Sequence, residues 1–175
     1  MSAIDPAQLE LARFHVYRSV AIQEYAQLES ALHQIITATL KCPLSQSAAI
    51  FYRLVNTRSR NQIIDACIRE ACGDMYEAYW HGIPRTSNRS GLTNIIQDID
   101  SKRNEIVHWV VRSIHELNVT TGERRFQIYL DKAENWFAQK QVSAGRFIED
   151  LDDFQKKCRF AYLSAGMFGH QISSG

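Results

Sequence analysis

The spacing of apolar residues along the chain is that of α-helices over most of its length. A first helix is predicted from Pro6, a residue suited to a first helical turn, to about Thr39. Pro43 ends this stretch. The apolar residues that share one face of this helix are Tyr25, Leu28, Leu32 and Ile35. The first predicted element is therefore a long amphipathic helix.

Shorter elements are predicted after Pro43. Ser45 is placed to cap a second helix that carries Ile50 and Phe51. The polar stretch 56–59 either interrupts this helix or starts a third one. The apolar residues of that third helix are Ile63, Ile64, Cys67 and Ile68. Residues 81–91 contain two glycines and a proline among mostly polar residues, which predicts a loop.

The strongest helical pattern covers residues 92–117. At about 100° per residue, one face of this helix is apolar and the opposite face is polar but uncharged. The apolar face contains Leu92, Ile96, Ile99, Ile106, Val110 and Ile114, and the polar face contains Gln97, Asn104, His108 and His115. Arg103 lies within the apolar stripe. Because a buried guanidinium without a partner is costly, Arg103 is expected to reach solvent or to meet an anion.

Two more elements complete the predicted fold. Residues 119–130 alternate between polar and apolar from Arg125 onward and contain Gly122, which predicts a small β-hairpin. A last helix is expected from about Ser143 to Ala165, and its stripe consists of Phe147, Leu151, Phe154, Cys158 and Tyr162. The sequence therefore predicts an all-α fold. We expect one domain over 1–175, an up-and-down bundle of four to five helices with a hairpin insertion near 119–130.

Composition narrows the class of protein. The chain has 175 residues, is 45% hydrophobic and 22% charged, and has a net charge of +1, which argues against a constitutive nucleic-acid coat protein. No apolar run approaches the roughly 18 residues that cross a bilayer, and no signal-peptide pattern is present. We therefore expect a cytoplasmic protein without a membrane partner. The four cysteines form no Cys-x-x-Cys pair, so no zinc site is predicted.

Candidate chemistry is concentrated in residues 98–111, DIDSKRNEIVHWVV, because the chain has no Gly-rich phosphate loop, His-Glu-x-x-His or Gly-x-Ser-x-Gly motif. In a chain of this composition, about 0.5 matches to an arginine and a histidine at this spacing are expected by chance, but requiring an adjacent asparagine lowers the expected number to about 0.02. A purely structural interpretation is that Arg103 pairs with a carboxylate of a neighbouring helix and that His108 is simply exposed.

The stretch from Lys102 to His108 resembles the Arg-x(4–6)-His motif of the HEPN superfamily, in which a polar residue, often asparagine, follows the arginine. The resemblance implies a metal-independent endoribonuclease that cleaves single-stranded RNA and acts as a toxin or an antiviral effector. It also implies that Arg103 and His108 are catalytic and that Asn104 supports them. It implies a homodimer with a shared cleft, an antitoxin or nucleotidyltransferase partner, and no cofactor. The alternatives are a non-catalytic module of this fold that binds a protein or nucleotide, and a helical scaffold with an accidental motif.

Several other residues are weaker candidates for contacts with RNA. Those closest to the motif are Lys102, Trp109, Arg112 and His115. Arg53, Arg58 and Arg60 could follow an RNA backbone, but a solvated helix face is the favoured interpretation. Arg85 and Arg89 flank the predicted loop and are candidates for a substrate lid.

Overall fold

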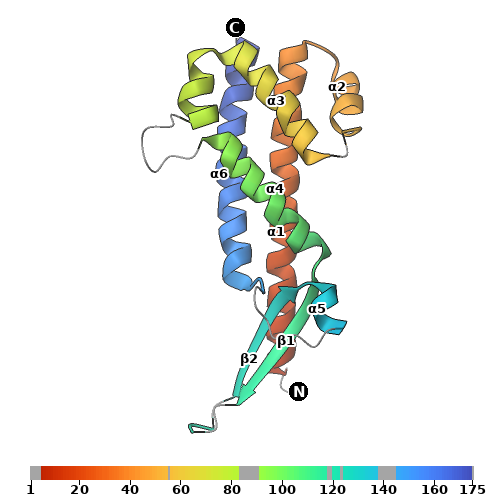
Figure 1. Cartoon of the computed structure of the whole chain (residues 1–175), viewed down its shortest axis with the longest axis vertical. Coiled ribbons are helices and arrows are strands. Elements are labelled where there is room, and N and C mark those ends of the chain that lie inside the picture. The colour runs from red at the N-terminus through yellow and green to blue at the C-terminus, as the bar shows by residue number, and fades with distance from the viewer. Residues whose placement is uncertain are drawn as a thin grey trace. The chain divides into compact units, whose positions relative to one another are not determined.

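A computed structural model of the chain describes residues 5–54, 56–82, 91–117, 120–122, 124–137 and 145–174. It confirms the predicted fold class, all-α with a small antiparallel hairpin (Figure 1). The elements are α1 (Pro6–Leu40), α2 (Leu44–Phe51), α3 (Thr57–Cys72), the π-helical segment η1 (Tyr76–Gly82), α4 (Leu92–His108), β1 (Val110–Leu117), β2 (Arg124–Asp131), α5 (Ala133–Phe137) and α6 (Ile148–Ser174).

The first helix has the predicted extent and the predicted buried face. Its start is fixed by Asp5, whose Oδ1 accepts a hydrogen bond from the Ala7 amide at 3.1 Å. The four residues of the predicted stripe are all at most 4% exposed: Tyr25, Leu28, Leu32 and Ile35. The helical periodicity of α1 was therefore a reliable guide to its core face.

The structure shows where the second and third helices begin. Helix α2 already begins at Leu44, after Pro43, and no side chain caps it, so the predicted cap at Ser45 is wrong. Helix α3 begins after Asn56, whose Oδ1 accepts a hydrogen bond from the Arg58 amide at 2.9 Å. The polar stretch 56–59 therefore starts a new helix. Arg85 and Arg89 lie outside the described residues.

The prediction of one helix over 92–117 is wrong. Helix α4 ends at His108, and β1 follows from Val110 (Figure 1). Bulky aromatic and β-branched residues after His108 favour extended backbone, and β2 supplies the pairing partner. Gly122 lies between the strands with φ of +71°, a conformation that glycine adopts without steric cost. The hairpin is thus larger than predicted, because its first strand was assigned to the helix.

The last helix begins later and continues further than predicted. It runs from Ile148 to Ser174, so Phe147 precedes it, and it continues past Ala165. Tyr162, which was expected in the apolar stripe, is 40% exposed. The buried apolar residues of α6 are Leu151, Phe154, Cys158, Ala161, Ala165 and Phe168.

The chain divides into two compact units, each made of segments that are distant in the sequence. The hairpin unit comprises Met1–Gln23 and Lys102–Gln155, and the helical unit comprises Glu24–Ser101 and Lys156–Gly175. Core residues of the hairpin unit include Phe14, Ile106, Tyr129, Leu130 and Phe154. Core residues of the helical unit include Leu28, Ile35, Ile68, Trp80, Ile99 and Phe168.

One arginine of the helical unit is buried, contrary to the predicted solvated face. Arg60 is only 7% exposed, and its Nη2 lies 2.7 Å from Glu29 Oε1 and 3.2 Å from Tyr25 Oη. Its guanidinium also lies over the Phe51 ring, 4.9 Å from the centroid. Arg53 and Arg58 are exposed as expected. The ion pair with Glu29 compensates for burying the charge of Arg60.

Candidate functional site

The three motif residues lie on the last two turns of α4, in the hairpin unit. Asn104 and His108 are exposed, and because they are four residues apart they share one side of the helix. Ile106, between them in sequence, is 3% exposed and belongs to the core. The predicted polar and apolar faces are therefore confirmed for this part of α4. His108, at the last position of the helix, is accessible to a ligand.

Arg103 is half-buried and contacts its neighbour Asn104. Its Nη1 donates a hydrogen bond to Asn104 Oδ1 at 3.1 Å. Arg103 and His108 are five positions apart, which places their side chains about 140° apart around the helix axis. The structure thus joins the arginine to the asparagine and places the histidine beside the asparagine on the exposed side.

The end of α4 is held by Arg18 of α1. The Nε of Arg18 donates to the Ile106 carbonyl at 2.8 Å, and its Nη2 donates to the carbonyls of Val107 and Trp109 at 2.9 and 3.2 Å. The last carbonyls of a helix have no partner within the helix and carry a partial negative charge, so a guanidinium is well suited to them. Partial burial lowers the pKa of Arg18, but an arginine remains charged at neutral pH. Arg18 therefore fixes the backbone that carries His108.

Trp109 follows the histidine, is half-buried and lies near two cations. The Arg146 guanidinium lies 5.6 Å from the centre of its ring, and the Lys132 ammonium lies 6.0 Å away. Arg146 also donates from Nε to Glu105 Oε2, and this hydrogen bond raises the pKa of Arg146. Arg146 thereby connects the segment before α6 to the side of α4.

Arg112 on β1 is engaged by a buried carboxylate of β2. Its Nη1 donates to Asp131 Oδ2 at 2.7 Å, and Asp131 is 2% exposed. Burial alone would raise the pKa of Asp131, but hydrogen bonds from Asn135, Arg112 and the Lys132 amide outweigh it and hold the pKa below its ordinary value. Arg112 therefore has a structural partner within the hairpin unit.

The remaining predicted residues are placed on different elements. His115 does not continue the line of Asn104 and His108 along a helix, because it lies on β1; it is exposed and its ring centre is 4.7 Å from that of Phe126. Lys102 is half-buried on α4. The structure therefore separates His115 from the helix face on which the sequence placed it.

Sequence reasoning missed three cations of this region, Arg18, Lys132 and Arg146. Arg18 is separated from its carbonyl partners by 88 to 91 positions, and Arg146 from Glu105 by 41. Such contacts depend on tertiary packing, so no local spacing in the sequence indicates them. The sequence feature that indicated such contacts is the excess of arginine over lysine, because a guanidinium suits multidentate contacts.

Among the residues that the structure describes, no group of three or more His, Cys, Asp or Glu side chains could hold a metal ion. Within the same residues, no helix is long and apolar enough to cross a membrane.

Comparison with protein-family models, curated proteins and solved structures finds no match to this chain. The resemblance to the HEPN superfamily therefore rests on the residues from Lys102 to His108 themselves.

Proposed function

We propose that this chain is an endoribonuclease that cleaves single-stranded RNA without a metal ion, with Arg103, Asn104 and His108 at its active site. The observation that carries the proposal is the exposure of His108 and Asn104, one turn apart at the end of α4, with Arg103 bonded to Asn104. The match of these residues to the HEPN motif supports the same assignment. A histidine held on a capped helix end suits this role, because its backbone is fixed while its ring is accessible.

The chemistry needs few groups, because RNA carries its own nucleophile. His108 takes the proton of the 2′-hydroxyl, and the 2′-oxygen attacks the adjacent phosphorus. The bond between phosphorus and the 5′-oxygen breaks, and that oxygen accepts a proton from water. Arg103 stabilises the negative charge that builds on the phosphoryl oxygens, and Asn104 orients the guanidinium through their hydrogen bond. The products are a 2′,3′-cyclic phosphate and a 5′-hydroxyl.

Residues beside His108 are suited to an RNA strand. Trp109 is partly exposed and can stack on a base, and Lys132 is an exposed cation near the same ring. Neither contact reads a base edge, so we expect cleavage with little sequence preference from these two residues.

The proposed active site contains one arginine and one histidine from each chain, directed to different sides of α4. A second copy, related by a two-fold axis, would supply the missing partner of each. We therefore propose a homodimer in which the motif helices border a common cleft, as the resemblance implies.

Metal-free cleavage of RNA by the purified chain tests the proposal. In excess EDTA, the wild type is expected to cut single-stranded RNA and to leave 2′,3′-cyclic phosphate ends. Arg103→Ala is expected to lose the activity, by about 100-fold or more, because the charge at the phosphate is lost. Cleavage that disappears with EDTA, or products with 3′-hydroxyl ends, would contradict the mechanism.

A second candidate function, a non-catalytic module that binds a protein or nucleotide, is favoured by one observation. Two arginines near the motif, Arg112 and Arg146, are paired with the carboxylates of Asp131 and Glu105. Such pairs reduce the positive charge that the surface offers to a phosphate backbone. A chain that binds its partner, an antitoxin or a nucleotidyltransferase, without cleaving RNA in the assay above would support this alternative.

A further inference from the structure

One arginine of the hairpin unit, Arg146, is held both by its backbone and by its side chain. Its amide donates to the Leu130 carbonyl at 3.0 Å, and its carbonyl accepts from the Leu130 amide at 2.8 Å. Because Leu130 is fully buried, these two hydrogen bonds fix the backbone of Arg146 to the core. The side chain donates from Nε to Glu105 Oε2, and the guanidinium lies near the Trp109 ring. The guanidinium therefore has a defined position before any ligand binds.

These contacts leave one edge of the guanidinium without a hydrogen bond. Among the residues that the structure describes, neither Nη1 nor Nη2 of Arg146 has a hydrogen-bond partner, and neither atom is buried. The two N–H groups on this edge are parallel, and such a pair matches two oxygens of a phosphate group. Arg146 can therefore bind a phosphate without giving up its hydrogen bond to Glu105.

Arg146 lies on the same side of α4 as His108. Its partner Glu105 is three positions before His108, which places the two side chains about 60° apart around the helix axis. The Trp109 amide donates to the Glu105 carbonyl at 2.9 Å, so the helical hydrogen bonding extends to the tryptophan. By the same count, Arg103 is about 160° from Glu105. The structure thus places a second guanidinium on the side of α4 that Arg103 does not occupy.

The charged groups around Arg146 leave its guanidinium fully charged. The hydrogen bond to Glu105, together with the negative charges of Glu105 and Asp150, raises the pKa of Arg146. These carboxylates lower the net positive charge here, so a phosphate contact depends on the geometry of the Nη edge and not on a broad basic surface. Lys132 is exposed, and its ammonium lies 6.0 Å from the centre of the Trp109 ring. An RNA strand at this place therefore meets two cations and an aromatic ring.

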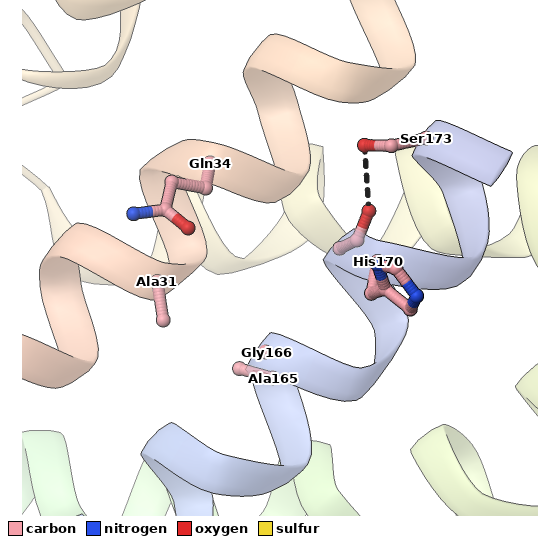
Figure 2. Close-up of a pocket in the computed structure, with 7 residues that line it drawn as sticks. Ala31, Gln34, Ala165, Gly166, His170 and Ser173 are labelled. Atoms are coloured by element: carbon pink, nitrogen blue, oxygen red, sulfur yellow. Dashed lines mark hydrogen bonds between the residues drawn. The ribbon is translucent and has the colours of Figure 1, made fainter.

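The groove between α1 and α6 in the helical unit has no comparable cation. Gln34, His170 and Ser173 supply the polar groups that line this groove, and the other residues that line it are alanines and glycines (Figure 2). No arginine or lysine is among these described lining residues. Arg146 is therefore the better matched partner for a phosphate.

We propose that Arg146 is a substrate-binding residue of the ribonuclease, and that its Nη1 and Nη2 donate to the oxygens of a phosphate next to the one that is cleaved. The inference rests on the proposed function and deepens it, since it identifies the residue that holds the RNA strand on the His108 side of α4. Arg103 stabilises the reacting phosphate, and Arg146 contacts a phosphate that does not react. Glu105 is a positioning residue, because it orients the guanidinium of Arg146.

Binding of a single-stranded 2′-O-methyl RNA oligonucleotide tests this contact, because this probe has the phosphates of RNA but lacks the nucleophilic hydroxyl and is not cut. Its Kd is measured by fluorescence anisotropy in EDTA between about 50 and 200 mM salt. Arg146→Met keeps an apolar stem but loses the charge, and is expected to raise Kd about tenfold. The slope of log Kd against log salt concentration is expected to fall by about 0.7, the contribution of one phosphate contact in a single strand.

Two further variants separate a phosphate contact from a general loss of charge or of stability. Arg146→Lys keeps the charge but not the two parallel donors, so we expect it to keep most of the salt slope and to recover only part of the affinity. The matched control is Arg159→Met in the helical unit, where Nε of Arg159 donates to Glu24 Oε1 at 2.7 Å, the same kind of pair. This control is expected to leave Kd and the salt slope unchanged. Melting temperatures show that each variant is folded.

Cleavage of ordinary RNA gives an independent measurement. A phosphate that does not react is bound equally in the ground state and the transition state. Arg146→Met is therefore expected to raise KM about tenfold and to change kcat by less than about threefold, whereas Arg103→Ala lowers kcat.

The outcomes distinguish this inference from the proposed function. A folded Arg146→Met variant with the Kd, salt slope and KM of a wild type that cleaves RNA would overturn the inference and leave the ribonuclease proposal standing. Equal weakening of binding by Arg146→Met and Arg159→Met would also overturn it, because the loss of any positive charge would then explain the effect. A wild type that binds the probe through Arg146 but cuts no RNA would support the contact and overturn the ribonuclease proposal.

Discussion

At the scale of single residues, the buried hydroxyl of Ser47 is satisfied by partners from its own helix and from α1. Ser47 is fully buried, and its hydroxyl lies 2.8 Å from His33 Nε2 and 2.7 Å from Thr37 Oγ1. It also donates to the Leu44 carbonyl at 3.0 Å. These contacts join α1 to α2, and the ring of His33 packs against Phe51 and Tyr52. The hydroxyl therefore contributes to stability and is inaccessible to a substrate.

His33 is expected to make the stability of the chain depend on pH. Burial lowers the pKa of His33 from its ordinary value of 6.5, so the folded state disfavours the protonated ring. Since the unfolded chain then binds more protons, stability is greatest above pH 6.5 and falls as the pH decreases below that value. Urea unfolding of the wild type between about pH 7 and pH 5 is expected to show this decrease.

His33→Gln is expected to be less stable at neutral pH but to lose much of this pH dependence, because glutamine can bond Ser47 without titrating. His170→Gln, an exposed position on α6, is the matched control and should keep the wild-type slope. Equal slopes in wild type and His33→Gln would rule out His33 as the source.

At the scale of elements, the end of α4 depends on a side chain that is distant in sequence. Arg18→Met keeps much of the packing of the arginine stem but leaves three carbonyls without a donor. We expect the free energy of unfolding to fall by about 1–2 kcal/mol, since water can reach part of this helix end. The control is Arg13→Met on the same helix, whose pair with Glu10 is exposed and 3.8 Å long. A loss below about 0.5 kcal/mol is expected there. Equal losses in the two variants would contradict the capping role.

The extent of each element could be predicted where one periodicity continued over many residues. The buried faces of α1 and of α4 up to Ile106 followed from helical spacing alone. The boundary after His108 could not be predicted that way, because Val110, Ile114 and Leu117 fit a helical stripe as well as a strand. Pairing with β2 makes these residues a strand and not a helix. This pairing depends on residues that lie beyond the turn.

At the scale of the whole molecule, the candidate site could be predicted in part. The motif residues were identifiable because they are adjacent in sequence and lie on one helix. The partners of Arg18 and Arg60 were not identifiable, because both make their contacts with residues distant in sequence. Arg60 was expected on a solvated face because it clusters in sequence with Arg53 and Arg58, yet α3 directs it toward Glu29 and Phe51.

The proposed shared cleft predicts that two inactive chains restore activity when mixed. If each cleavage uses Arg103 of one copy and His108 of the other, a mixture of Arg103→Ala and His108→Ala chains contains dimers with one intact site. About a quarter of the wild-type activity is expected from random mixing, measured as RNA cleaved per chain. A mixture as inactive as its components, from chains shown to exchange, would contradict the shared cleft.

The most direct test of the ribonuclease proposal compares two exposed histidines of the hairpin unit. His108→Ala is expected to abolish cleavage of single-stranded RNA in EDTA, because it removes the proposed base, while its melting temperature stays near that of the wild type. His115→Ala, on β1, removes the same kind of side chain from another exposed position and should keep nearly all of the activity. Equal cleavage by the wild type and His108→Ala would contradict the account.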